Sequence, residues 1–243
     1  MPSRPRIPIH ARRVPARHGV AWLRGGWTLF RQQPLAWLLI MAACFLSGLL
    51  ISLLPVVNLL SGVLYPVFWG GLMFAAHRQH HTGKLTPRDL FAGFRARFAS
   101  LALLGLLAMA AMLLTVLPLI VTGGASLLAH PFAYGDALAA WNGLSLAGLF
   151  VACVAGLLVW LTMGAALWFA PALVMLAELE PLAALRASLS ACLRNPLAGL
   201  VYGALSGVLL VLGCLPLLTG LVFVVPVLTA SAYVSYRDLF IDA

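Results

Sequence analysis

Apolar residues fill six long stretches of this chain, and short polar segments separate them. About 20 consecutive apolar residues are needed for a helix to cross roughly 30 Å of hydrocarbon. We therefore predict six transmembrane helices, paired into three hairpins. The apolar run around the fourth begins at residue 144, so that helix either tilts or starts in the outer interface. The predicted spans are 36–54, 57–76, 99–121, 147–177, 197–214 and 217–234.

A basic segment with one apolar face precedes each hairpin. The segments 23–37, "LRGGWTLFRQQPLAW", and 185–199, "LRASLSACLRNPLAG", share one outline. The segment 86–98, "TPRDLFAGFRARF", opens with Thr-Pro and has Asp89 in its first turn, as helix N-termini favour. Apolar residues at helical spacing predict three amphipathic helices. We expect each either to lie in the membrane plane with its arginines among headgroups, or to pack against the bundle as a connector.

Matching landmarks predict an internal repeat. Arg24 precedes Pro34 by the same number of residues as Arg186 precedes Pro196. The middle of the chain holds a weaker copy, so the repeated unit is an amphipathic helix followed by a hairpin, used three times. The later matches are Pro55 with Pro216, Pro66 with Pro226, and Arg78 with Arg237.

The composition excludes a water-soluble globular protein. The chain is 63% hydrophobic and 9% charged, with a mean hydropathy of +1.04, whereas soluble chains have about 25% charged residues. The four cysteines form no C-x-x-C pair, and we interpret them as small buried apolar residues. The predicted fold is an all-α membrane protein, with a disordered basic segment over 1–18 and a single six-helix transmembrane domain over 19–243.

The positive charges set the orientation. The net charge is +9, and all 15 Lys and Arg residues fall in the N-terminal segment, the 77–98 and 178–196 connections, or the C-terminal tail. The three opposite connections have none. By the positive-inside rule, both termini are cytoplasmic. We interpret the Arg-rich N-terminus as a retained cytoplasmic segment, with a transit peptide as the alternative, and we expect no nucleic-acid partner.

Two sets of residues are candidates for function. Each hairpin's returning helix has a proline that can kink it, at Pro66, Pro171 and Pro226. Kinks at matched depth would open a vestibule like those of transporters, although proline is also common in membrane helices. Arginines of the amphipathic segments are candidates for anionic lipid headgroups, namely Arg17, Arg24, Arg31, Arg88, Arg95, Arg97, Arg186 and Arg194.

Catalytic and metal-binding signals are weak. No ionisable residue lies well inside a predicted span, which disfavours a proton-coupled pump. His77 and His81 have the i, i+4 spacing of metal ligands, but no carboxylate is near and Arg78 repels a cation, so we favour a solvated loop. Glu178 and Glu180 suit the start of the third amphipathic helix. We therefore expect no cofactor, no metal and no enzymatic activity.

Three motifs resemble a known group of proteins. The segments "GWTLFRQQPLAWL", "AALRASLSACLRNP" and "ASAYVSYRDLF" resemble an uncharacterised family of six-pass inner-membrane proteins of proteobacteria. A more distant resemblance is to the membrane-anchor domains of glycerophosphodiester phosphodiesterases. The resemblance implies an inner-membrane location and a six-helix bundle. It implies no catalytic residues, because the chain has no phosphodiesterase domain.

The expected function is therefore non-enzymatic. We expect a structural, assembly or lipid-interacting role, with anionic lipids of the cytoplasmic leaflet as partners, besides a homo-oligomer or another membrane protein. The alternative is a small permease, exporter or channel, which requires a polar path lined by Tyr65, Thr162 and Tyr202. A membrane-embedded lipid enzyme would require Glu178, Glu180 or the His77–His81 pair to converge at one cleft.

Overall fold

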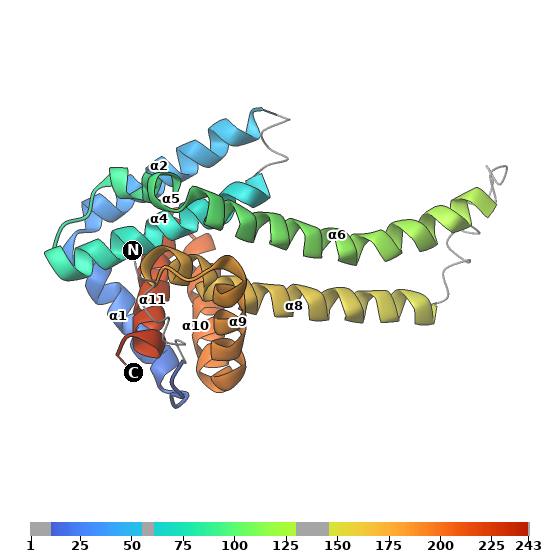
Figure 1. The fold of residues 1–243 in the computed structure, drawn as a ribbon. Helices are drawn as coiled ribbons and strands as arrows, with labels where there is room; N and C mark the ends of the chain where they lie inside the picture. The colour runs from blue at the N-terminus through green and yellow to red at the C-terminus, as the bar shows by residue number, and fades with distance from the viewer. Residues whose placement is uncertain (1–10, 55–60, 130–145, 243) are drawn as a thin grey trace, which may run out of the picture.

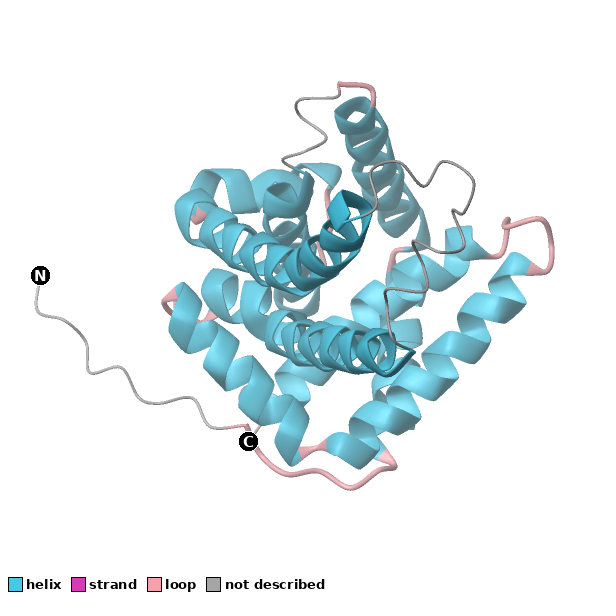
Figure 2. Ribbon diagram, turned by 90° about the vertical axis from the view of Figure 1, so that its right-hand side faces the viewer, coloured by secondary structure: helices cyan, strands magenta, loops and turns pink. Residues whose placement is uncertain are grey.

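A computed structural model describes residues 11–54, 61–129 and 146–242, and across these residues the chain is helical without strands. Figure 2 shows the helices joined by short loops. A short helical element comes before each pair of long apolar helices. The elements, labelled as in Figure 1, are α1 His18–Gln32, α2 Pro34–Ser52, α4 Ser61–Thr82, η1 Pro87–Phe91, α5 Ala92–Ala96, α6 Phe98–Ala129, α8 Leu146–Leu176, α9 Pro181–Arg194, α10 Pro196–Cys214 and α11 Leu221–Phe240.

Three described helices are long and apolar enough to cross a membrane, over Pro34–Ser52, Cys153–Leu176 and Pro196–Cys214. A fourth crossing is added if Pro87–Ala96 and Phe98–Leu114, which meet at 87°, count as one broken span. The second and sixth predicted spans correspond to α4 and α11, which are not among these helices. Residues 57–60 of the second span lie outside the described part.

Both α4 and α11 extend past the predicted spans into polar sequence. Residues 77–82 continue α4, so the prediction of a solvated loop around His77 and His81 is wrong. Residues 235–240 likewise continue α11. The extra turns are stable because they are packed, and Gln79 in α4 is only 1% exposed.

The three short elements pack against the long helices. We call α1, η1–α5 and α9 the entry helices, because each comes before a pair of long helices. The first, α1, contacts α11 and α10; η1–α5 contacts α4; and α9 contacts α8. These contacts cover part of their apolar faces, whereas Trp27, Leu182 and Leu193 are exposed, as are most of their arginines. The interfacial and the connector interpretations both stay predictions.

Small residues permit the closest of these contacts. A Cβ on Gly26 of α1 would lie 2.6 Å from the backbone nitrogen of Ser231 in α11. A Cβ on Gly71 of α4 would overlap the carbonyl oxygen of Leu90 in η1. Such direct backbone contacts between helices are typical of membrane proteins, where small side chains allow close packing.

The second entry helix differs from its prediction. The segment 86–98 forms a 3₁₀ turn and a five-residue α-helix that ends at Ala96, rather than one helix. Thr86 and Asp89 form the reciprocal hydrogen bonds of a capping box at its start. Within this element, Gly93 lies so close to α4 that a Cβ there would be 2.4 Å from the Val67 carbonyl oxygen.

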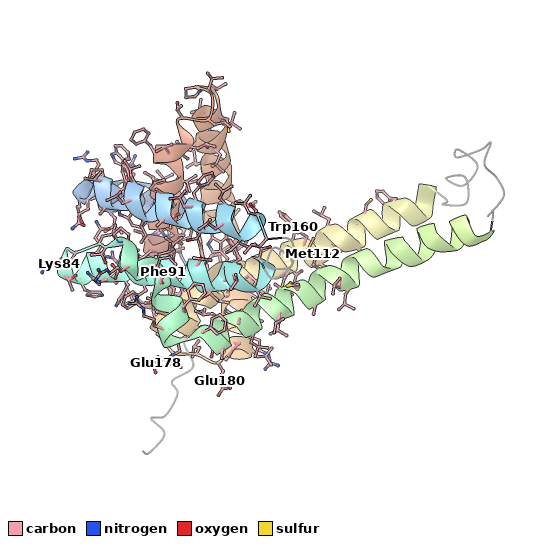
Figure 3. All side chains as sticks on the ribbon, turned by 90° about the horizontal axis from the view of Figure 1, so that it is seen from above. Lys84, Phe91, Met112, Trp160, Glu178 and Glu180 are labelled. Atoms are coloured by element: carbon pink, nitrogen blue, oxygen red, sulfur yellow. The ribbon has the colours of Figure 1, made fainter. Side chains whose placement is uncertain are left out.

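Apolar side chains cover the outer surfaces of the long helices. Phe45 of α2, Trp160 of α8 and Leu200 of α10 are each about two-thirds or more exposed, at 71%, 71% and 68%. Helices α6 and α8 run side by side away from the other elements, and Figure 3 shows Met112 and Trp160 near the base of this extension. Apolar surface on this scale indicates that lipid, rather than water, surrounds these helices.

Candidate lipid-headgroup interface

One residue separates each entry helix from the long helix that follows it. These elbow residues are Gln33, Arg97 and Asn195. Their backbone angles are similar, with φ and ψ of −144° and 64° at Gln33, −142° and 34° at Arg97, and −127° and 46° at Asn195. Each elbow nitrogen donates back to its entry helix, and each elbow carbonyl accepts from the first turn of the next helix. The helical backbone is therefore broken in a similar way at three places.

The elbow side chains hold segments from elsewhere in the chain. Asn195 accepts a hydrogen bond from the Val14 nitrogen at 2.8 Å and donates to the Arg12 carbonyl at 3.0 Å. Gln33 accepts from the Leu85 nitrogen at 3.1 Å and donates to the Gly83 carbonyl.

Arg97 makes a different contact, a side-chain ion pair of 2.6 Å with the exposed Glu178. The segments held by the three elbows are those directly ahead of α1, η1 and α9. Gln33 binds the segment ahead of η1, and Arg97 binds the segment ahead of α9. Asn195 binds the segment ahead of α1. The contacts form a closed ring.

Asp238 of α11 completes the attachment of the N-terminal segment. Its carboxylate accepts from His18 Nδ1 at 2.8 Å and from Trp22 Nε1 at 2.7 Å, and it pairs with Arg12. Burial raises the pKa of Asp238, but these hydrogen bonds and the Arg12 charge outweigh burial and hold the pKa below its usual value. Residues 11–17 thus dock onto the bundle, which corrects the expected disorder for this part of 1–18; residues 1–10 lie outside the described residues.

The histidines at the end of α4 contact α11. His77 Nδ1 lies 3.2 Å from the Tyr233 hydroxyl, and His80 Nε2 lies 2.6 Å from an Arg237 nitrogen. The His77 and His81 rings are 4.3 Å apart. Burial and then the neighbouring His81 and His80 lower the pKa of His77, which favours its neutral form. Within the described residues, no group of three or more His, Cys, Asp or Glu side chains could hold a metal ion.

A buried hydrogen-bonded pair, which the sequence did not reveal, joins three helices. Trp37 Nε1 of α2 donates to Gln79 Oε1 of α4 at 2.8 Å, and Gln79 Nε2 donates to the Leu29 carbonyl of α1 at 2.8 Å. Trp37 and Gln79 are both almost fully buried. Buried polar groups need such partners, so this pair fixes the positions of α1, α2 and α4 relative to each other.

Most of the candidate headgroup ligands are accessible. Arg97 is the exception, because it is partly buried and already paired with Glu178. Figure 3 places Glu178 near Glu180, at the start of α9. The exposed candidates are Arg17, Arg24, Arg31, Arg88, Arg95, Arg186 and Arg194.

Two cavities bring candidate arginines together with other residues. One, of about 520 Å³, lies between α1, α10 and α11 and is almost wholly apolar, with Arg24 and Thr28 in its lining. The other, of about 610 Å³, is basic: Arg186 and Arg194 of α9 share it with Arg13 of the N-terminal segment. The sequence did not single out Arg13, because only the docking of the N-terminal segment brings it to α9.

The residues that would indicate a transport path do not line one together. Tyr65 is 59% exposed and Thr162 is exposed on α8, whereas Tyr202 is buried and lies 2.8 Å from the Ser231 hydroxyl. The kink candidates Pro66, Pro171 and Pro226 are buried inside α4, α8 and α11, each of which remains helical through its proline. Whether they bend these helices stays a prediction.

Comparison with known proteins gives one informative match. A Burkholderia thailandensis protein named "probable inner membrane protein" is 32% identical over 229 residues, which is 90% of this chain and 82% of the relative. No family model matches the chain, and no solved structure matches it. The resemblance to phosphodiesterase anchor domains stays a prediction.

Proposed function

Since this chain belongs to the family of the Burkholderia thailandensis inner-membrane protein, we propose that it is a six-span protein of the bacterial inner membrane with a non-enzymatic, lipid-interacting role. Its two termini are cytoplasmic in this proposal. The six spans form three repeated units, each an entry helix followed by a hairpin. Anionic lipids of the cytoplasmic leaflet bind the arginines of the entry helices and thereby anchor an assembly or structural element.

The elbow residues are the main support for the repeat. Three breaks with similar backbone angles, each holding the start of another entry helix, are expected from three copies of one unit arranged in a ring. The glycine contacts agree with this alignment. Gly26 and Leu90 take equivalent places in their entry helices, and their partners Ser231 and Gly71 each lie five residues after an intrahelical proline.

The exposed arginines are the observation on which the lipid-interacting role depends. Arg17 caps the start of α1, Arg24 and Arg31 lie on α1 itself, and all three are exposed. Trp27, 47% exposed on the same helix, suits the membrane interface. Basic side chains at this depth attract anionic headgroups by about 1 kcal/mol each.

The other functions receive less support. A permease needs a shared polar path, and Tyr65, Thr162 and Tyr202 face different surroundings. A lipid enzyme needs free acid–base groups in one cleft, but Glu178 is paired with Arg97 and His77 is bonded to Tyr233.

Lipid binding by an α1 variant tests the proposal. The full chain, purified in a neutral detergent, is titrated with phosphatidylglycerol and with phosphatidylcholine. Changing Arg17, Arg24 and Arg31 together to Gln should weaken phosphatidylglycerol binding and leave the weaker phosphatidylcholine binding unchanged. The matched variant with Lys at these positions keeps the charge and should retain most of the affinity. Equal affinity of the Gln variant and the unmodified protein would refute the lipid-interacting role.

A further inference from the structure

The basic cavity has its positive charges from two distant parts of the chain. Arg13 comes from the N-terminal segment, while Arg186 and Arg194 lie two turns apart on α9. The cavity holds about 610 Å³, and Leu189, Ser190, Leu193 and Pro196 complete its lining. All three arginines are exposed.

Like the exposed arginines of α1 and η1–α5, these arginines form no ion pair with a carboxylate of the described residues, but they are grouped around one cavity. In the described part of the chain, Asp89 pairs with Arg78, Glu178 with Arg97, Asp238 with Arg12, and Asp242 with Arg237. No such ion pair involves Arg13, Arg186 or Arg194 among the described residues. Three uncompensated guanidinium groups around one cavity repel each other, so an anion that enters relieves this repulsion. Guanidinium groups favour phosphate oxygens because they can donate two parallel hydrogen bonds.

The position of the cavity selects a lipid phosphate rather than a free one. Pro196 is the first residue of α10, a helix apolar enough to span the membrane, so the arginines lie at the depth of headgroups. Leu193 in the lining is 70% exposed, and Leu197 and Leu200 continue this apolar surface along α10 with exposures of 66% and 68%. A phosphate among the arginines would therefore have its acyl chains directed along an apolar helix surface.

We propose that the cavity formed by Arg13, Arg186 and Arg194 is a discrete site for the phosphate of one anionic phospholipid. The inference rests on the lipid-interacting role proposed above. It adds that Asn195 is a positioning residue for this site, because its amide holds the backbone on both sides of Arg13, at Arg12 and Val14. The docked N-terminal segment thereby supplies the third arginine.

A charge-matched comparison tests the site. The full-length protein in neutral detergent is titrated with short-chain phosphatidylglycerol, short-chain phosphatidylcholine and inorganic phosphate. R186Q/R194Q should weaken phosphatidylglycerol binding about tenfold or more. R88Q/R95Q, which removes the same charge from the second entry helix, should weaken it clearly less, because these two arginines contribute diffuse attraction and are not grouped with Arg13. Asn195→Asp, which removes the donor to the Arg12 carbonyl, should weaken binding in the same direction.

Each other outcome has a distinct meaning. Equal weakening by both double variants would overturn the discrete site and leave diffuse attraction, with the lipid-interacting role intact. Phosphate binding as tight as that of phosphatidylglycerol would overturn the assignment to a lipid. Absence of phosphatidylglycerol binding by the unmodified protein would overturn both this site and the proposed function. Because Arg186 and Arg194 are exposed, loss of folding does not obscure the result, and gel filtration verifies this.

Discussion

Gln33 and Asn195 make the same kind of contact at two distant places in the chain. Each stands between an entry helix and a long helix that begins with proline, and each uses its amide to bind one backbone N–H and one backbone C=O of another segment. The contacts connect segments that lie far apart in the sequence. The stability of the bundle should therefore depend on these neutral side chains more than on the many exposed charges.

Replacement of Gln33 tests this dependence. Gln33→Ala removes the bonds to Gly83 and Leu85, and should lower the free energy of unfolding by about 1–3 kcal/mol, because the partner groups are left less well satisfied. Gln32→Ala is the matched control, since Gln32 is exposed at the neighbouring position. Reversible unfolding in mixed micelles measures both. If the two variants lose the same stability, the elbow contact is unimportant.

A Cβ at Gly71 should disrupt the contact between α4 and η1. Gly71→Ala would force the new atom into the Leu90 carbonyl, so we expect a loss of several kcal/mol or failure to fold. Gly203→Ala is the control, because nothing lies within 4 Å of a Cβ there. That change should be neutral or stabilising by up to about 1 kcal/mol. Thermal stability and yield in detergent measure the difference, and equal behaviour of the two variants would contradict the close contact.

Asp238 should make the protein sensitive to acid. Because its pKa is lower in the folded state than its ordinary value of 3.8, the stabilisation is complete above about pH 4 and is lost as the pH falls further. Melting temperatures between pH 6 and pH 3 should therefore drop for the unmodified protein. Asp238→Asn should be less stable at pH 6 and should lose this part of the pH dependence. Asp242→Asn, which changes a more exposed carboxylate, should keep it.

His77 should act in a higher pH window. Its pKa is lowered on folding, so the stabilisation is present above its ordinary value of 6.5 and is lost as the pH falls below that value. Melting temperatures measured from pH 8 to pH 5 should decrease, and His77→Gln should flatten the decrease. A curve of unchanged slope in this variant would show that His77 does not titrate in the expected way.

Labelling from outside the cell tests the six-span arrangement. Single cysteines at Lys84 and Arg237, in a variant with the four natural cysteines replaced, should resist a membrane-impermeant maleimide until the membrane is permeabilised. A cysteine at Pro216, between α10 and α11, should react in intact cells. Labelling of position 84 or 237 in intact cells would overturn the topology and the assignment of the basic side to the cytoplasm.

The sequence predicted some boundaries closely because single residues determine them. The predicted spans began at residues 36 and 197, close to Pro34 and Pro196, where α2 and α10 begin. Proline suits the first position of a helix, where its missing N–H would have no partner. The break at Arg97 is similar, but Phe98 follows it in place of proline, and the segment was therefore predicted as one helix.

The buried polar contacts could not be predicted for a different reason. Gln79 and Asp238 lie in segments that looked solvated, and their burial depends on partners such as Trp37 and Trp22 from other parts of the chain. The candidate arginines were easier to identify, because exposed basic residues follow directly from the charge pattern. Their grouping with Arg13 required the docked N-terminal segment.

The closed ring of elbow contacts has a consequence for biosynthesis. Residues 12–14 are translated before the residues to which they bind, because Asn195 and Asp238 lie near the C-terminal end of the chain. While the ribosome delivers the intervening hairpins to the insertion machinery, the earliest segment has no docking surface and α1 lacks its covering helix. The N-terminal segment is therefore synthesised first but can dock only after Asn195 and Asp238 have been made. A chain arrested before Asn195 would present an uncovered basic helix to the proteases of membrane quality control.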